Sequence, residues 1–302
     1  MTRAGTVAVL GRPNAGKSTL VNALVGRKVA IVSSQPQTTR HRITGVLTEA
    51  RGQVVLFDLP GVHRPLHRLN AQMMHLVRDT LGEVDAVVQL FDAARAPGAG
   101  EQFVVGLLQG LEAPVVLVPN KIDLAHAARH LEQRTAFYTG QHSYAAVCPV
   151  SARTGAGIEA LEGALFGVLP EGEPWLDPDL GTTQSERFFV AELIREAMLA
   201  RVSDELPFQT AVHLRHFEEQ ETPKGPLLRL FADLVVERES QKGILVGARG
   251  EAIKAIGTAA RRQIEKLLGA RVYLDLRVTA RAGWREDPRF LAELAAVEAT
   301  LK

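Results

Sequence analysis

The chain has 302 residues, of which 46% are hydrophobic and 23% charged. This composition indicates a globular rather than a disordered protein, and the length leaves room for two domains of roughly 100–200 residues each. The formal net charge of +1 indicates no partner by itself. The single cysteine, Cys148, excludes an intrachain disulfide and favours a reducing, cytoplasmic compartment, and no apolar run approaches the roughly 18 residues that a membrane-spanning helix needs.

A glycine-rich motif follows the first predicted strand, residues 6–10. The sequence Gly11-Arg12-Pro13-Asn14-Ala15-Gly16-Lys17-Ser18 fits the phosphate-binding pattern G-x-x-x-x-G-K-[ST], and residues 19–25 continue with helical spacing. The N–H groups of such a loop, at the positive end of a helix, attract phosphate. Lys17 would reach the β- and γ-phosphates, and the Ser18 hydroxyl would hold Mg²⁺. A glycine-rich turn that binds nothing is the alternative, which the flanking strand and helix disfavour.

A polar loop over residues 29–42 leads into a predicted hairpin with strands over residues 43–49 and 53–58. The second strand ends in Asp58-Leu59-Pro60-Gly61. Ligands of open α/β sheets bind at the carboxyl ends of the strands, so Asp58 would act on Mg²⁺ through its water shell and the Gly61 N–H would meet a γ-phosphate. Alone, D-x-x-G is a common turn at a strand end. Its place after a phosphate loop favours the nucleotide site.

Helices and strands then alternate to about residue 170. Apolar spacing predicts helices over residues 66–81, 101–111 and 154–169, and strands over residues 85–92, 115–119 and 147–150. This alternation is typical of an α/β domain with a mostly parallel, doubly wound sheet, here with one antiparallel edge strand. Cys148, inside the last strand, is expected to be a buried structural thiol.

Two further motifs at strand ends point to the base of the nucleotide. In Asn120-Lys121-Ile122-Asp123, the Asp123 carboxylate could accept two hydrogen bonds from guanine, whereas adenine would leave it unpaired. Asn120 would brace the phosphate loop, the Lys121 stem would lie over the base, and Ser151-Ala152 would offer a backbone N–H to guanine O6. The alternative for Asp123 is a helix N-cap.

Taken in order, these motifs resemble those of the Era-type GTPases, in the TrmE-Era-EngA group of P-loop GTPases. The segment Pro36-Gln37-Thr38-Thr39-Arg40-His41-Arg42-Ile43 is similar to the switch I segment of that family, although Leu59 stands where the family more often has threonine. The resemblance implies GTP and GDP as ligands. It also implies that Thr39, or alternatively Thr38, contacts Mg²⁺ and the γ-phosphate, and that Asn14 helps to hold a K⁺ ion.

The expected site has three overlapping sets of residues. The catalytic set is Lys17, Thr39 and Gly61, and the Mg²⁺ set is Ser18, Thr39 and Asp58. The nucleotide-binding set is Gly11, Arg12, Pro13, Asn14, Ala15, Gly16, Lys17, Ser18, Thr19, Asp58, Leu59, Pro60, Gly61, Val62, Asn120, Lys121, Ile122, Asp123, Ser151, Ala152 and Arg153. In Ras-like enzymes a glutamine after D-x-x-G orients the attacking water. The Val62 side chain cannot form a hydrogen bond, so slow intrinsic hydrolysis is expected.

The second half of the chain begins after a segment rich in Pro, Gly and acidic residues, 171–184, which predicts a linker between domains 1–170 and 185–302. Ser185 is a predicted N-cap for a helix over residues 186–202. Strands over residues 210–219 and 227–238, the sequence Gly247-Ala248-Arg249-Gly250, a helix over 251–268, a strand over 271–278 and a closing helix over 287–301 follow. The α-β-β-α-α-β order resembles an α+β type II KH domain.

Residues 240–285 contain ten Lys and Arg against three Asp and Glu, a basic patch in a nearly neutral chain. KH domains clamp about four nucleotides with a G-x-x-G loop. The expected RNA-binding residues are Gly247, Ala248, Arg249, Gly250, Lys242, Lys254 and Arg261. Trp284 is expected to be packed, with stacking on a base as the alternative.

The family resemblance implies a cytoplasmic monomer that acts in small ribosomal subunit assembly and 16S rRNA processing. It would bind the small subunit near the 3′ end of its RNA and would contact the inner surface of the cell membrane peripherally. Two other hypotheses stay open from the sequence. A P-loop ATPase or kinase would show no preference for guanine, and a non-enzymatic RNA-binding scaffold with a vestigial nucleotide site would bind RNA regardless of Lys17.

Overall fold

The computed structural model describes residues 1–35, 38–63, 68–223 and 225–296. The chain forms two compact units, the first reaching Thr183 and the second beginning at Gln184. Within the described residues, no helix has the length and apolar character needed to cross a bilayer.

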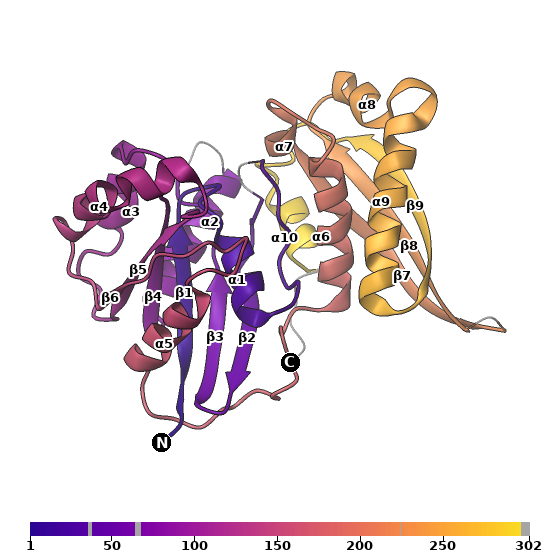
Figure 1. Ribbon diagram of the computed structural model, residues 1–302. Coiled ribbons are helices and arrows are strands. Elements are labelled where there is room, and N and C mark those ends of the chain that lie inside the picture. Colours follow the sequence, from indigo (N-terminus) through magenta and orange to yellow (C-terminus); the bar gives the residue numbers. More distant parts are fainter. Residues whose placement is uncertain (36–37, 64–67, 224, 297–302) are drawn as a thin grey trace. The chain divides into compact units, whose positions relative to one another are not determined.

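The first unit is built on a six-stranded sheet in the order β2-β3-β1-β4-β5-β6 (Figure 1). Its strands are β1 (Arg3–Gly11), β2 (Ile43–Glu49), β3 (Gly52–Asp58), β4 (Ala86–Asp92), β5 (Val115–Asn120) and β6 (Ala146–Val147). All neighbours pair in parallel except β2 and β3, so the predicted α/β fold with one antiparallel edge strand is confirmed. The central strands are apolar and buried because helices cover both faces of the sheet.

Five helices cover this sheet: α1 (Lys17–Val25), α2 (Arg68–Leu81), α3 (Ala99–Gly106), α4 (Ala125–Thr139) and α5 (Ile158–Val168). Side chains of α2 and α3, such as Val77 and Val104, pack on Leu10 and Val87 of the sheet. Helices α1 and α5 pack against each other and the opposite face. The strand register places Asp58 beside Val9, and Asp92 beside Asn120. The polar ends of these strands therefore meet at one edge of the sheet.

Several observed bounds differ from those predicted, most clearly for α3 and β6, and helix α4 was not predicted. Helix α3 starts at Ala99, two residues before the predicted start, because the Glu101 carboxylate accepts a hydrogen bond from Gly98 N at 2.9 Å and caps the first turn. It ends at Gly106, five residues before the predicted end. Strand β6 is limited to Ala146 and Val147, since Pro119 of the neighbouring β5 lacks the N–H group that a longer ladder would require, although Cys148 N and Val150 N still donate to β5. Cys148, just beyond β6, is buried as predicted.

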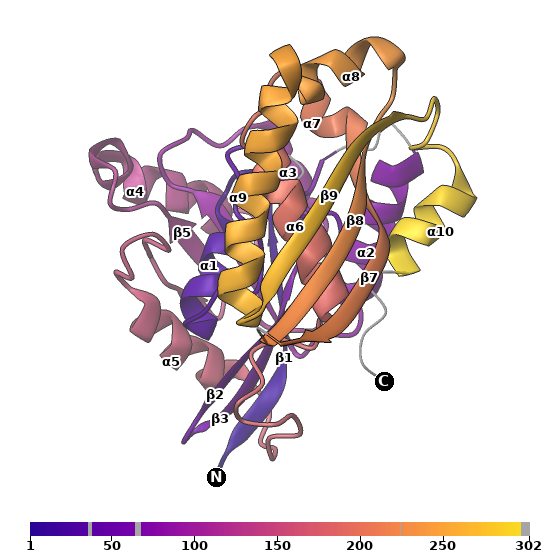
Figure 2. The ribbon, with the colours of Figure 1, turned by 90° about the vertical axis from the view of Figure 1, so that its right-hand side faces the viewer.

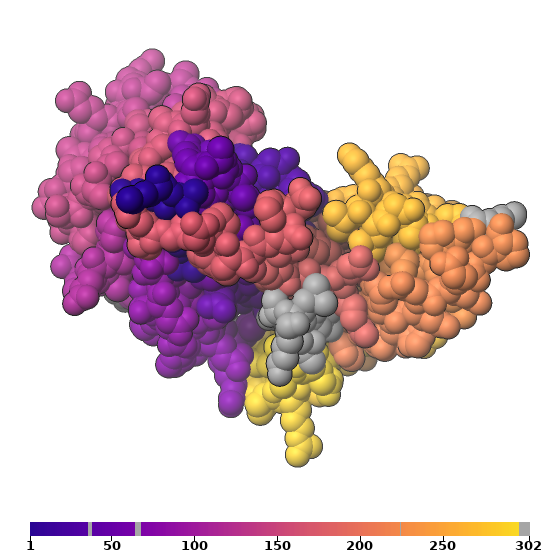
Figure 3. Space-filling view, turned by 90° about the horizontal axis from the view of Figure 1, so that it is seen from below, coloured from indigo at the N-terminus to yellow at the C-terminus, as the bar shows by residue number. Residues whose placement is uncertain are grey.

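The segment after α5 lies along the first unit (Figure 3). Gly172 N donates to Thr2 O at 3.1 Å, and the buried Gln53 side chain accepts from Trp175 N at 3.1 Å and donates to Leu176 O at 2.9 Å. These bonds fasten much of the predicted linker to β1 and β3.

The second unit has a three-stranded sheet in the order β7-β8-β9, antiparallel and then parallel (Figure 2). Its elements are α6 (Glu186–Leu199), α7 (Leu206–Gln209), β7 (Thr210–Thr222), β8 (Gly225–Val236), α8 (Glu239–Val246), a 3₁₀ turn (Ala248–Gly250), α9 (Glu251–Leu268), β9 (Arg271–Ala280) and α10 (Pro288–Ala296). Apart from the short helix α7, which was not predicted, this is the expected KH order. Ser185 Oγ caps α6 by accepting from Phe188 N at 3.2 Å. The last part of the predicted closing helix, residues 297–301, lies outside the described residues.

The core of the second unit follows strand and helix periodicity. Alternate residues of β8, Leu228, Leu230 and Ala232, are buried, as are Ile256 and Ala260 of α9. Helices α6 and α9 pack together on this face of the sheet. The core therefore fixes α9 beside β9, where it forms one wall of a groove.

Candidate nucleotide site and RNA-binding groove

The phosphate loop connects β1 to α1 and depends on its glycines. A side chain on Gly11 would place Cβ 2.3 Å from the backbone oxygen of Leu90. Gly16 has φ +100°, and a Cβ there would lie 2.3 Å from Asn120 Nδ2. Since glycine has no Cβ, the backbone can turn tightly at both positions. The loop can therefore direct its N–H groups inward at the start of α1.

Lys17 extends back along this loop and is only 6% exposed. Its Nζ donates to the carbonyl oxygens of Gly11 at 3.2 Å and Arg12 at 3.1 Å. Burial lowers the pKa of Lys17 to about 8, although the nearby Asp58 carboxylate favours the charged form. The ammonium is thus held at the loop with few contacts to water.

Three oxygen-bearing side chains converge beside Lys17. Ser18 Oγ lies 2.5 Å from Asp58 Oδ2 and 2.9 Å from Thr39 Oγ1, and Thr39 Oγ1 lies 3.3 Å from Asp58 Oδ2. The Thr38 hydroxyl instead donates to Gln35 O at 2.6 Å, within its own loop. The structure therefore brings together the residues expected to hold Mg²⁺, with Thr39 rather than Thr38 among them.

The D-x-x-G segment lies directly against the phosphate loop. Val62 N donates to Gly11 O at 3.1 Å, and a Cβ on Gly61 would lie 2.8 Å from the Pro13 side chain. Val62 is 1% exposed and belongs to the core beneath the loop. Its side chain therefore cannot take the place of the water-orienting glutamine.

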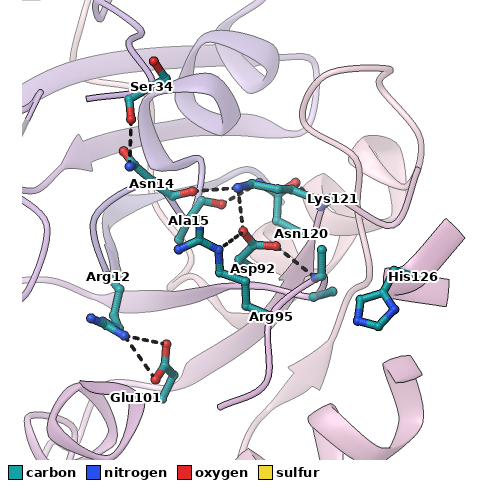
Figure 4. Close-up of polar contacts among 12 residues, drawn as sticks. Arg12, Asn14, Ala15, Ser34, Asp92, Arg95, Glu101, Asn120, Lys121 and His126 are labelled. Carbon is teal, nitrogen blue, oxygen red and sulfur yellow. Dashed lines mark hydrogen bonds and ion pairs between the residues drawn. The ribbon is translucent and has the colours of Figure 1, made fainter. Parts of the chain in front are cut away.

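Asn120 joins the two halves of the site. Its Nδ2 donates to Ala15 O at 2.8 Å, and its Oδ1 accepts from Lys121 N at 2.8 Å and Ala152 N at 3.0 Å. Lys121 Nζ donates to Asn14 O at 2.8 Å and to Asp92 Oδ2 at 2.7 Å (Figure 4). The phosphate loop and the base-recognition motifs are thereby held as one rigid frame.

Asp92 is a residue of this frame that the sequence reasoning missed. It accepts from Lys121 and pairs with Arg95 at 3.6 Å. Its position at the end of a buried strand, like that of Asp58, was the available signal.

Asp123 faces two donors. Ser151 Oγ donates to Oδ1 at 2.6 Å and Arg153 Nη2 donates to Oδ2 at 2.5 Å. The hydrogen bond from Ser151 is the main reason that the pKa of Asp123 lies below its ordinary value. The backbone N–H of Ser151 itself donates to Ala156 O at 2.8 Å. Asp123 is thus a fixed, ionised acceptor, which suits a base with two adjacent donors.

The G-x-x-G sequence forms the 3₁₀ turn between α8 and α9. Gly247 has φ +72°, Gly250 has φ +80° and Arg249 has φ +50°. This turn begins α9, whose side chains Lys254 and Arg261 line a groove of about 430 Å³ against Leu274 and Leu276 of β9. The groove therefore combines an apolar floor with cationic side chains.

Of the expected RNA-binding residues, Lys254 and Arg261 line the groove, while the turn at residues 247–250 does not. The structure also tests two other residues considered for RNA binding, Lys242 and Trp284. Lys242 also lies outside the groove, on α8, and pairs with Glu239 at 3.1 Å. Trp284 is fully buried, and its Nε1 donates to Gln209 O at 3.2 Å. The expected packing of Trp284 is therefore confirmed, and the alternative of base stacking is wrong because the packed core covers its ring.

Comparison with known proteins supports both units. Residues 6–121 match the family model described as 50S ribosome-binding GTPase, and residues 227–285 match the model described as KH domain. The GTPase Era of Heliobacterium modesticaldum is 43% identical over 289 residues, covering 96% of this chain and 95% of that protein. The chain belongs to the Era family of GTPases. It is therefore a GTPase, as predicted.

Further Era proteins agree over the whole length. The GTPase Era of Xanthomonas oryzae pv. oryzae is 45% identical, with 94% of each chain covered. A crystal structure of Era with MgGDPNP and nucleotides 1506–1542 of 16S ribosomal RNA is 32% identical, with a TM-score of 0.91 and coverage of 97% of this chain and 99% of that one. A variant of Aquifex aeolicus Era bound to GDP and AlF₄⁻ has a TM-score of 0.89, the same identity and the same coverage of both chains.

Proposed function

We propose that this Era-family GTPase binds the 3′ end of small-subunit ribosomal RNA through its KH domain and acts in small-subunit assembly and 16S rRNA processing. The cationic groove between α9 and β9 is the observation that supports this proposal. An Era protein that this chain matches over 99% of its length was crystallised in complex with nucleotides 1506–1542 of 16S rRNA. The description of the matching family model names the 50S subunit, but that model covers only residues 6–121 and not the KH domain.

We propose that residues 1–170 form the GTP-binding domain and residues 185–302 the RNA-binding domain, with residues 171–184 as the linker between them. Lys17 and the loop N–H groups would hold the β- and γ-phosphates. The oxygens of Ser18, Thr39 and Asp58 lie within 3.3 Å of one another and are the ligand type that Mg²⁺ prefers. When bound, Mg²⁺ would neutralise charge on the phosphates, and Gly61 N–H would add a donor to the γ-phosphate.

The neutral, buried Val62 leaves activation of water to other groups, so the proposed enzyme is slow without an added factor. We propose that the side-chain oxygen of Asn14 helps to bind a monovalent cation, K⁺, near the phosphates. Its Nδ2 donates to Ser34 O at 2.9 Å, and its Oδ1 receives no hydrogen bond from the described part of the chain.

Potassium dependence tests the role of Asn14. Hydrolysis is expected to be roughly tenfold faster in KCl than in NaCl at equal ionic strength, because a cation would stabilise charge that develops on the phosphates. Asn14→Gly fits the φ of +63° at this position and removes the oxygen, so it should lose the difference between the salts. Phosphate release measured in both salts provides the check. Equal rates for the unmodified protein would refute the cation site.

Charge reversal in the G-x-x-G turn tests the RNA site. Ala248→Asp combined with Arg249→Asp keeps both glycines and should weaken binding on the order of 10²-fold, since two carboxylates would face the RNA backbone. Aspartate tolerates the positive φ of Arg249. Fluorescence anisotropy with a synthetic RNA of the 3′ end of the source organism's 16S rRNA measures the loss.

GTP hydrolysis should stay unchanged in that double variant, which separates a KH defect from general unfolding. The glycines are poor test positions because a Cβ on Gly247 would lie 2.8 Å from Ala252 N. Unchanged RNA affinity with intact hydrolysis would contradict the assignment.

We extend the proposal to a cytoplasmic monomer with peripheral contact to the inner membrane surface, as the family resemblance implies. Sedimentation equilibrium tests the monomer. Flotation with vesicles of anionic lipid tests the membrane contact.

A further inference from the structure

A second cavity lies behind the phosphate loop. It has a volume of about 250 Å³ and is bounded by residues 12–15 of the loop, residues 89–92 at the end of β4, helix α3, and Tyr138 of α4. Its volume exceeds that of a few waters, at about 30 Å³ each, and is below the roughly 300–1,000 Å³ of a site for a drug-sized ligand. The space suits a molecule of fragment size.

Two residues that are almost fully buried, Tyr138 and Gln89, present polar groups to this cavity. Tyr138 is 1% exposed, and its hydroxyl forms no hydrogen bond with any described residue. Gln89 is equally buried. Its Oε1 accepts from Tyr144 Oη at 2.5 Å, while its Nε2 donates to no described residue. Neither donor is sealed inside the core. Both open onto the cavity, where the acceptor atom of a bound molecule can meet them.

The charged residues of the cavity do not supply that acceptor. Glu101 is held by Arg12 at 3.2 Å and by Gly98 N at 2.9 Å. Asp92 is held by Lys121 at 2.7 Å and Arg95 at 3.6 Å (Figure 4). Both carboxylates are thus already paired, whereas the Tyr138 hydroxyl and the Gln89 amide remain as donors without a partner among the described residues.

We propose that this cavity is a second ligand site, which binds a fragment-sized organic carboxylate with an apolar body. The carboxylate would accept from the Tyr138 hydroxyl and the Gln89 amide, with Arg12 and Arg95 lining the same cavity. The apolar body would contact Leu90 and Val104.

The site is positioned to influence the nucleotide. Pro13 and Asn14 line this cavity and also the smaller one on the phosphate side of the loop, together with Lys17 and Ser18. A ligand that restricts these residues from behind changes the free energy of the loop conformation, which couples the two sites.

Benzoate is a suitable probe, and binding can be followed by methyl NMR of Val104 and Leu90 in the nucleotide-free protein. We expect saturable shifts at millimolar benzoate and none with benzyl alcohol, which has the ring without the anion. Tyr138→Phe should weaken benzoate binding about tenfold through loss of one hydrogen bond to a charged group. Tyr273→Phe removes a hydroxyl from an exposed tyrosine of the second unit and should change nothing.

Absence of shifts up to 50 mM benzoate, or equal affinity of Tyr138→Phe and the unmodified protein, would overturn the proposed site. The coupling between this cavity and the nucleotide site is measured in a separate experiment. Saturating benzoate should change the Kd of a fluorescent GDP analogue about threefold or more in the unmodified protein, but not at the same concentration in a Tyr138→Phe variant. Benzoate binding with an unchanged nucleotide Kd would refute the coupling alone. Because the first measurement uses no nucleotide, it does not depend on the proposed function.

Discussion

Replacement of Lys17 by methionine is expected to abolish most GTP hydrolysis and, at the same time, to stabilise the nucleotide-free protein. The loss of hydrolysis follows from removing a cation aimed at the phosphates, an effect on the order of 10²–10³-fold in rate. The gain in stability follows from burial, because Lys17 is 6% exposed and its pKa falls from 10.5 to about 8.

The direction of the stability effect can be worked out from that pKa. Below pH 8 both the folded and the unfolded chain carry the proton, so the folded state bears the full cost of burying an ammonium. Between pH 8 and 10.5 the unfolded chain binds more protons at this site, and stability therefore rises with pH. At about 1.4 kcal/mol per pKa unit, the cost at neutral pH is about 3 kcal/mol.

The methionine variant does not gain the whole of that ~3 kcal/mol, because it also loses the hydrogen bonds from Nζ to Gly11 O and Arg12 O. We therefore expect a net gain of about 1–2 kcal/mol at pH 7, and a smaller gain at pH 10. Urea unfolding without nucleotide or Mg²⁺ measures the change. Lys266→Met, at an exposed position on α9, is the matched control and should change stability little. A Lys17→Met variant that is less stable than the unmodified protein at pH 7 would contradict this account.

The phosphate side of the site could be predicted from sequence because its chemistry is local. Gly11, Gly16 and Lys17 lie close together in sequence and match a fixed motif spacing, although the atoms that exclude a side chain at the glycines, Leu90 O and Asn120 Nδ2, come from other strands. The central strands were also predictable, since parallel strands buried on both faces are continuous apolar runs.

The remainder of the site depends on tertiary contacts that lie far apart in sequence. Asp92 acquires its role only because β4 and β5 are neighbours, which brings Lys121 Nζ within 2.7 Å. Trp284 was expected to be packed, but its partners were not predicted: its ring packs with Phe290 and its Nε1 donates to Gln209 O. Neither the role of Asp92 nor these partners of Trp284 have a signal in local periodicity, because each is decided by the register and packing of other elements.

Helix ends illustrate a smaller failure of the same kind. The spacing of apolar residues predicted α3 over 101–111, but the Glu101 side chain caps Gly98 and starts the helix earlier. Boundaries of this sort are set by a few side-chain bonds worth about 1 kcal/mol, which periodicity does not report.

Replacement of Asp123 by asparagine is expected to change the base that the enzyme accepts. Asp123 is positioned by Ser151 Oγ at 2.6 Å and keeps an ionised carboxylate for two guanine donors. Asparagine offers one oxygen and one NH₂ group, so one guanine donor would face another donor. Sites built around such bonds reject a mismatched ligand by up to about 10⁴–10⁵-fold. We expect GTP affinity to fall on the order of 10³-fold.

The same change should create affinity for xanthine nucleotides, because xanthine carries an oxygen where guanine has its amino group. Ser151 would orient the new amide by donating to its oxygen, leaving the NH₂ group toward the base. Arg153, whose side chain is 73% exposed, can turn away from that NH₂ group into solvent at little cost. Hydrolysis of XTP and GTP by Asp123→Asn, measured beside the control Asp179→Asn, decides the point. If Asp123→Asn kept its preference for GTP, guanine recognition would have to lie elsewhere in the site, and the role assigned to this carboxylate would be wrong.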